Sequence, residues 1–217
     1  MNKPQQWQQI ILNAIPVVGY WFWNWSMFSI VYLYWMEAVI ISLFVFLKIA
    51  MARGEASYGM PGPGVGARIF SGLRILVLRL LILGFYWIFI LIFVALGQGK
   101  YSTNESIENL RIIVMMHPGF NVAVLAFFLS QILTFMRTFI YSGDYLNTPS
   151  AAYKLFFDAR TIIIHIVIVL GTFSYQFLEK YASVDNRLPG LGFVVILFLL
   201  KSIADLIAQN FAVKKVD

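Results

Sequence analysis

Ionisable side chains inside long apolar segments are the residues of this sequence best suited to chemistry. Glu37 lies in the middle of the apolar segment 27–46, and Arg79 lies one turn into the segment 75–96. A charged side chain at the centre of a spanning helix costs about 2.5–3.5 kcal/mol on insertion scales, so it persists where it is paired or serves a purpose. The candidates for a ligand site or polar core are Glu37, Arg79, Arg137, Asp158, Arg160, His165, Lys201 and Asp205.

Three later segments, 120–141, 160–178 and 191–211, carry polar residues at helical spacing, and such spacing places them on one face of each helix. Because lipid is the least favourable surroundings for these faces, we expect them to face one another. The three stripes are Ser130, Gln131, Thr134, Arg137, Thr138 and Tyr141; Asp158, Thr161, His165, Thr172 and Gln176; and Lys201, Asp205 and Gln209.

A structural explanation of the same charges stays open beside the functional one. Arg79, Arg137 and Arg160 are near enough to segment ends to extend their guanidinium groups to the membrane surface. Lys201 and Asp205 are four residues apart and can neutralise each other on one helix. Glu37 is the strongest functional candidate, because a carboxylate at the midplane is too short to reach the surface. Its alternative role is a salt bridge or hydrogen bond to another helix.

Composition explains what must position these residues. The chain is 60% hydrophobic and 12% charged, whereas soluble domains average about 45–50% apolar and about 25% charged. A spanning helix needs about 20 apolar residues, so we predict an all-α fold in one transmembrane domain, residues 1–217. The predicted helices are 8–23, 27–46, 75–96, 120–141, 160–178 and 191–211.

Orientation follows from the basic residues between the segments. With six crossings and a cytoplasmic N-terminus, the inner regions hold ten lysines and arginines and the outer regions hold four. This bias predicts that both termini are cytoplasmic. It also places most of the ionisable candidates in the cytoplasmic half of the membrane, with Glu37 near the midplane. We therefore expect a polar interior that is closed toward the outside and nearer to water from the cytoplasm.

The connections differ in character. Gly and Pro residues in 59–66 predict a flexible loop from Met51 to Arg74. An S-x-x-E capping box from Ser102 to Glu105 predicts a short amphipathic helix near 103–116 on the outer surface. The first segment is the least certain span, because it is short and contains Asn13 and Pro16; if it only re-enters the membrane, five crossings remain.

Several kinds of chemistry are excluded or left without support. The chain has no cysteine, which excludes disulfides and thiolate sites, and its basic residues form no patch for nucleic acid. Imidazole with carboxylates suits zinc, manganese or iron, and His165 with Glu37, Asp158 or Asp205 offers such groups. No local spacing supports a metal site, so none is predicted, and no cofactor or catalytic residue is assigned.

Several of these residues belong to a longer pattern that resembles a known family. The pattern reads Asn13-x-x-Pro16-x-x-Gly19, Leu33-Tyr34-Trp35-x-Glu37, Asp158-x-Arg160 with His165, and Leu200-Lys201 with Asp205-Leu206. It is similar to uncharacterised prokaryotic integral membrane proteins that form a domain of unknown function, over nearly the whole chain. Members commonly have Glu-Asn where this chain has Glu37-Ala38. The resemblance implies a shared site at the ionisable residues but no activity.

Two functional hypotheses of different classes follow. The first is a protein that binds a small ligand, lipid or ion in its polar interior, or acts as a transporter or channel subunit. The alternative is a membrane scaffold or accessory subunit of a larger complex, and an intramembrane enzyme of unknown chemistry is third. The expected partners are membrane lipids, further copies of the chain or other membrane subunits, in the cytoplasmic membrane of a prokaryote.

Overall fold

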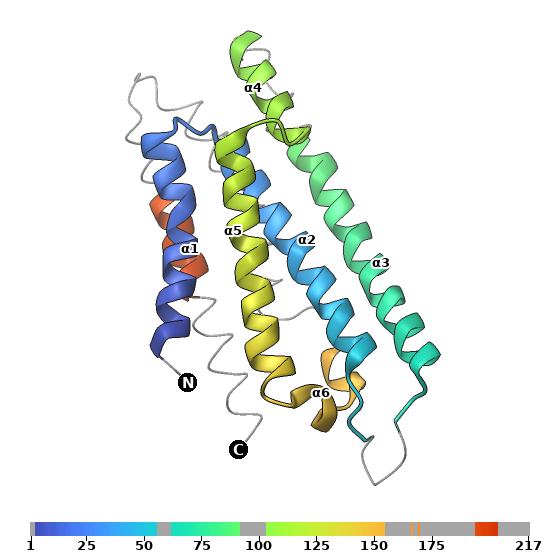
Figure 1. Cartoon of the computed structure of the whole chain (residues 1–217). Helices are drawn as coiled ribbons and strands as arrows, with labels where there is room; N and C mark the ends of the chain where they lie inside the picture. Colours follow the sequence, from blue (N-terminus) through green and yellow to red (C-terminus); the bar gives the residue numbers. More distant parts are fainter. Residues whose placement is uncertain are drawn as a thin grey trace. The chain divides into compact units, whose positions relative to one another are not determined.

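The described residues form helices joined by short turns. A computed structural model describes residues 3–55, 62–91, 103–154, 166, 169 and 194–203, and the regular structure in them is helical (Figure 1). This confirms the predicted all-α class. The elements are α1 (Lys3–Phe22), α2 (Met27–Met51), α3 (Val65–Ile90), α4 (Thr103–Ile113), α5 (Pro118–Phe135), the π-helix η2 (Met136–Ile140), α6 (Asp144–Asn147), the 3-10 helix η3 (Ser150–Tyr153) and an unlabelled helix over 194–203.

Three helices are long and apolar enough to cross a membrane: Phe28–Met51, Val65–Ile90 and Asn109–Ile140. Two shorter apolar helices, Ile10–Phe22 and Val194–Ile203, belong to the first and last predicted segments. The predicted segment 160–178 lies outside the described residues except for Ile166 and Val169, which are helical. The number of spans beyond three and their orientation remain predictions.

The contacts divide the chain into two units. Unit 1 comprises Met1–Trp35, Tyr86–Val124 and Phe157–Asp217, and unit 2 comprises Met36–Phe85 and Leu125–Phe156. The long helices α2, α3 and α5 each contribute one portion to each unit.

In unit 2, α2 packs between α3 and α5. Gly72 of α3 approaches α2 so closely that an added Cβ would lie 3.1 Å from the ring of Phe46. On the other side, the ring of Phe44 lies 5.9 Å from that of Phe128 and 5.6 Å from that of Phe135, both on α5. A glycine permits the close approach on one side, and aromatic rings fill the space on the other. The central helix α2 is therefore the one whose polar residues are shielded most completely.

The predicted loop from Met51 to Arg74 is wrong over its second half, because α3 begins at Val65. The Arg68 guanidinium donates a 2.7 Å hydrogen bond to the carbonyl of Ala52, which holds the first turn of α3 against the end of α2. Glycine, proline and arginine lower the hydropathy of this stretch, yet residues 67–71 contain no helix breaker. Helix α3 therefore begins well before the apolar segment that hydropathy predicts.

A folded segment covers the end of unit 2 where α2 finishes and α3 begins, which we call the hairpin end. The backbone N–H of Arg53 donates to the carbonyl of Tyr145 at 2.6 Å, and that of Gly54 donates to Thr148 at 3.2 Å. Asp144 accepts hydrogen bonds from the hydroxyls of Thr148 and Tyr153. These bonds tie α6 and η3 to the end of α2.

In unit 1, Trp25 in the connection between α1 and α2 packs against α1 and the start of α5. A Cβ on Gly19 of α1 would overlap the Trp25 ring, so the side chain fits only because residue 19 is glycine. On its other side, the ring of Trp25 lies 6.1 Å from that of Phe120, the third residue of α5. The backbone N–H of Phe120 donates to Nδ1 of His117 at 3.0 Å, so His117 caps the start of α5.

The short helix predicted near 103–116 is present as α4. Asn109 is buried and accepts a 3.1 Å hydrogen bond from Ser26, which joins α4 to the start of α2. Ile107 and Leu110, on the predicted apolar face, are 45% and 60% exposed. That face is available for contact with a membrane surface, although its predicted outer location stays a prediction. Ser102 of the predicted capping box lies outside the described residues.

Candidate functional site

Unit 2 contains a set of buried polar side chains contributed by all three of its long helices. Glu37 of α2 is 0% exposed and Arg79 of α3 is 4% exposed. Ser130 and Gln131 of α5 are also buried. We call these four residues the unit 2 polar set. Burying ionisable groups costs far more than burying apolar ones, so the position of Glu37 and Arg79 inside apolar helices needs a physical reason.

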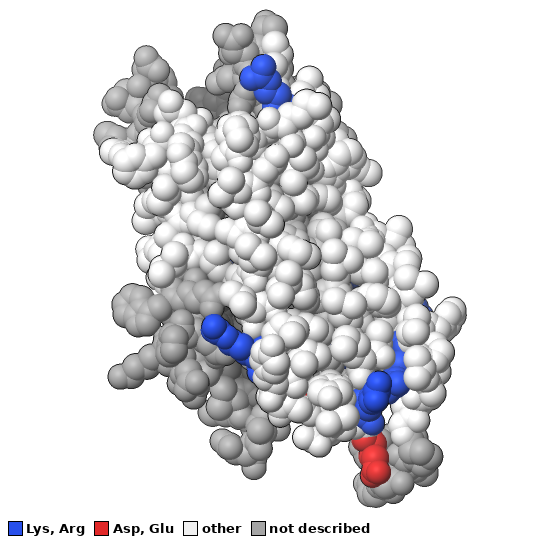
Figure 2. Space-filling view, viewed as in Figure 1, with Lys and Arg blue, Asp and Glu red and all other residues white. Residues whose placement is uncertain are grey.

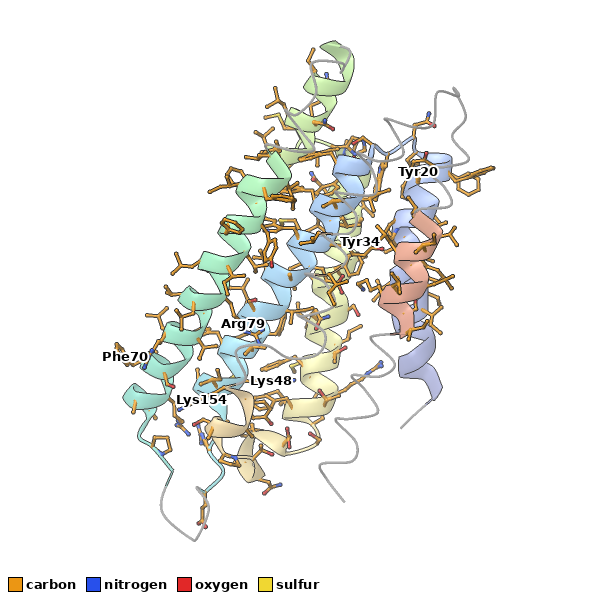
Figure 3. All side chains as sticks on the ribbon, turned by 180° about the vertical axis from the view of Figure 1, so that it is seen from behind. Tyr20, Tyr34, Lys48, Phe70, Arg79 and Lys154 are labelled. Carbon is orange, nitrogen blue, oxygen red and sulfur yellow. The ribbon has the colours of Figure 1, made fainter. Side chains whose placement is uncertain are left out.

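Glu37 and Arg79 lie on two packed helices at depths that differ by about one helical turn. Arg68 of α3 donates to the carbonyl of Ala52, which sets the register of the two helices. Glu37 precedes Ala52 by 15 residues (52 − 37), and Arg79 follows Arg68 by 11 residues (79 − 68). At 1.5 Å per residue, Arg79 lies about 6 Å nearer the hairpin end than Glu37. Arg79 projects from the side of α3 that borders α2 (Figure 3). A carboxylate and a guanidinium are thus buried on neighbouring helices of the same unit.

The polar stripe predicted on 120–141 divides into a buried and an exposed part. Ser130 and Gln131 are buried, whereas Arg137, Thr138 and Tyr141 are exposed. The division coincides with the change from α5 to the π-helix, where the N–H of Tyr141 donates to the carbonyl of Met136 at 2.8 Å. A π-turn holds an extra residue and rotates the side chains that follow it. Arg137 is therefore outside the polar set.

Lys201 occupies a separate place, in unit 1. Its side chain is 1% exposed, and its ammonium donates to the amide oxygen of Asn13 on α1. The ammonium also lies 5.7 Å from the centre of the Tyr34 ring, within the range of a cation–π interaction. Tyr34 extends from α2 toward the 194–203 helix (Figure 3). The two ends of the sequence are thereby joined around one buried positive charge.

Asn13 is the participant that the sequence reading missed. It is 0% exposed, and besides accepting from Lys201 it donates to the hydroxyl of Ser202 at 3.4 Å. The available signal was an amide in an otherwise apolar segment, which we interpreted as weakening the first span. An amide in such a segment also provides a donor and an acceptor for another helix.

The remaining predicted residues cannot be assigned a position. Asp158, Arg160, His165 and Asp205 lie outside the described residues. The predicted pairing of Lys201 with Asp205 and the predicted meeting of three polar faces therefore stay predictions. Among the residues that the structure describes, no group of three histidine or acidic side chains could hold a metal ion.

Comparison with known proteins places the chain in a family. The model of a family of unknown function, DUF6498, matches residues 1–216. This confirms the predicted resemblance to an uncharacterised family that covers nearly the whole chain. No curated protein and no solved structure matches the chain.

Proposed function

The chain belongs to the DUF6498 family of unknown function, and from this premise we propose that it binds a small polar or ionic solute within the membrane, at the unit 2 polar set. The observation that carries the proposal is the burial of Glu37 and Arg79, 0% and 4% exposed, in helices long and apolar enough to span. Evolution removes such costly groups from spanning helices unless they are useful. Binding a solute is the use that this donor and acceptor set fits best.

The chemistry of the set suits a solute that carries charge or both signs of charge. Glu37 offers a carboxylate for a cation or amine, and Arg79 offers a guanidinium for a carboxylate or phosphate. Ser130 adds a hydroxyl and Gln131 adds an amide, which can each donate and accept hydrogen bonds. Four polar groups from three helices can surround a small solute without any metal or prosthetic group.

The proposed setting is a six-span protein with both termini in the cytoplasm of a prokaryotic cell. The excess of basic residues in the predicted inner regions, ten against four, supports this orientation. It places the hairpin end on the cytoplasmic side, and the polar set deeper in the membrane than that end. Six helices are few for a complete transporter, so we propose that the chain works as one subunit of an oligomer.

Thermal unfolding of the purified full chain in detergent tests the proposal. A screen of inorganic ions, amino acids and small carboxylates should contain at least one solute that raises the melting temperature. Glu37→Gln should abolish that stabilisation, and Glu55→Gln is the matched control because Glu55 is an exposed carboxylate near the hairpin end. A stabilising solute that acts equally on Glu37→Gln and on the unmodified chain would contradict the proposed site.

The scaffold alternative makes a different prediction. A scaffold would co-purify with other membrane proteins in mild detergent, and Glu37→Gln would leave that association unchanged. The exposed apolar residues of α3 do not favour this alternative, because lipid covers such a surface equally well.

A further inference from the structure

The hairpin end of unit 2 is strongly basic, and part of its charge is engaged in holding the fold. Arg68 donates to Ala52, and the Lys48 ammonium lies 5.8 Å from the centre of the Tyr153 ring. Both oxygens of Asp144 accept hydrogen bonds from neighbouring hydroxyls. The charged residues of this end are Lys48, Arg53, Arg68, Arg74, Arg137 and Lys154 against Glu55 and Asp144.

Figure 2 shows lysine and arginine atoms gathered over the part of unit 2 where α2 ends and α3 begins, beside an acidic side chain. Arg53 and Arg74 are both exposed in this part. An exposed excess of positive charge at the end of spanning helices attracts anionic lipid headgroups. The charge alone identifies no binding site, but the surroundings of Arg74 do.

Arg74 lies on an apolar face of α3. Phe70 is 72% exposed, Leu73 is 48% exposed and Val77 is 47% exposed. Phe70 and Val77 are four and three residues from Arg74, and Leu73 is adjacent to Arg74. All of them therefore share one face of the helix. Because α3 has the length and hydropathy of a membrane span, this exposed apolar face is suited to acyl chains. An arginine within it must extend its guanidinium toward the headgroups.

We propose that Arg74 binds the phosphate of an anionic phospholipid whose acyl chains lie along Leu73, Val77 and Leu81, the last of which is 65% exposed. The guanidinium donates paired hydrogen bonds to the phosphate oxygens, a geometry that suits arginine better than lysine. Arg53 adds positive charge at the same end of the unit and strengthens the attraction. The site lies on the exposed, lipid-facing surface of α3, so it is independent of the solute site at Glu37.

The placement of α3 supports this occupant. The helix begins at Val65 and has 26 residues, which corresponds to about 39 Å and exceeds the hydrocarbon thickness of about 30 Å. Its first turns are held to the end of α2 by Arg68. The extra length can carry α3 through the headgroup layer, where Arg74 has access to phosphate while Val77 still faces acyl chains.

Native mass spectrometry of the full chain tests the proposal. The chain is stripped of lipid in detergent, and phosphatidylglycerol and phosphatidylcholine with identical acyl chains are then added in turn. The unmodified chain should bind phosphatidylglycerol more tightly. Arg74→Gln should weaken that binding about fivefold and leave phosphatidylcholine binding unchanged. Leu81→Ala should weaken binding of both lipids, because acyl chains contact this side chain whatever the headgroup. Arg111→Gln, which removes an exposed arginine from α4, is the charge-matched control and should have no effect.

Three results would overturn the lipid site. One is equal binding of the two lipids to the unmodified chain, and another is an equal loss with Arg111→Gln and Arg74→Gln. The third is displacement of phosphatidylglycerol by inorganic phosphate at matched ionic strength, which would identify a phosphate ion site instead. If Arg74→Gln fails to fold, Arg74→Lys replaces it: it retains the charge but cannot make the paired hydrogen bonds, so the preference for phosphatidylglycerol should fall. An unchanged preference in the folded variant would contradict the proposal.

Discussion

The two units of this chain hold buried charge in different ways. In unit 1, the ammonium of Lys201 donates to the neutral amide of Asn13 and lies over the ring of Tyr34. In unit 2, Glu37 and Arg79 are buried opposite charges on two neighbouring helices. The first arrangement joins distant parts of the sequence around a cation, whereas the second collects several kinds of polar group from three helices.

The comparison separates a structural use of charge from a binding use. The contact of Lys201 with Asn13 connects residues 188 positions apart, so it serves to hold distant parts of the chain together. The unit 2 polar set offers a carboxylate, a guanidinium, a hydroxyl and an amide, which is a broader chemistry than one helix contact needs. We therefore expect substitutions in unit 1 to lower stability and substitutions in the unit 2 set to lower binding.

The largest loss of stability should come from Asn13→Leu. This change removes one hydrogen-bond acceptor from the buried Lys201 ammonium, and a hydrogen bond to a charged group contributes about 1.5–3 kcal/mol. The melting temperature in detergent should fall sharply. The double variant Asn13→Leu with Lys201→Met should recover much of the loss, because it removes both the acceptor and the charge. If the loss of stability in the double variant equals the sum of the losses in the two single variants, the two residues do not act together.

Gly19→Ala should have the next largest effect, also in unit 1. The added Cβ overlaps the ring of Trp25, so either the ring or α1 must move, and overpacking of this kind costs about 1–3 kcal/mol. Gly84→Ala is the matched control, because nothing lies within 4 Å of a Cβ at that position of α3. That control should be neutral or slightly stabilising, since alanine favours helix. Equal melting temperatures for the two variants would contradict the packing of Trp25 on Gly19.

Tyr153→Phe should have the smallest effect and should depend on pH. The variant loses one hydrogen bond to Asp144, worth about 1 kcal/mol, but keeps the ring beside Lys48. Burial first and the hydrogen bond to Asp144 second raise the pKa of the Tyr153 hydroxyl above its ordinary value of 10.0. The unfolded chain therefore loses this proton first, and stability falls as the pH rises above about 10.

The pH dependence provides the check. The difference in melting temperature between the unmodified chain and Tyr153→Phe should shrink as the pH is raised above about 10. Tyr141→Phe serves as the control, because the Tyr141 side chain is 77% exposed. A constant difference across that pH range would mean that the Tyr153 proton does not contribute to stability.

The helical class could be predicted from composition, and several boundaries could not. Hydropathy located the apolar centre of α3 but not its start, because Arg68 and Gly72 resemble loop residues until Ala52 and Phe46 are known to lie beside them. Pro118 does begin α5, as its fixed backbone angle favours at a first helical position. Local chemistry is therefore readable from the sequence, whereas the length of a helix depends on what packs against it.

The candidate site shows the same limit. The cost of burying charge was sufficient to select Glu37, Arg79 and Lys201, and all three are buried. Arg137 was selected by its helical spacing with Ser130, but Arg137 belongs to the π-helix 136–140 and is exposed. The role of Asn13 depends on Lys201, which no local spacing can reveal. Spacing along one helix thus predicts which residues share a face, and only the contacts between helices decide what that face meets.

The most direct test compares the melting temperatures of Glu37→Gln and Asn13→Leu in the same detergent, without added solute. If the unit 2 polar set is a binding site and the Asn13–Lys201 contact is structural, Glu37→Gln should stay within about 1 kcal/mol of the unmodified chain, while Asn13→Leu loses about 1.5–3 kcal/mol. A loss for Glu37→Gln as large as that for Asn13→Leu would show that Glu37 holds the fold together, and would contradict the proposed division between the two units.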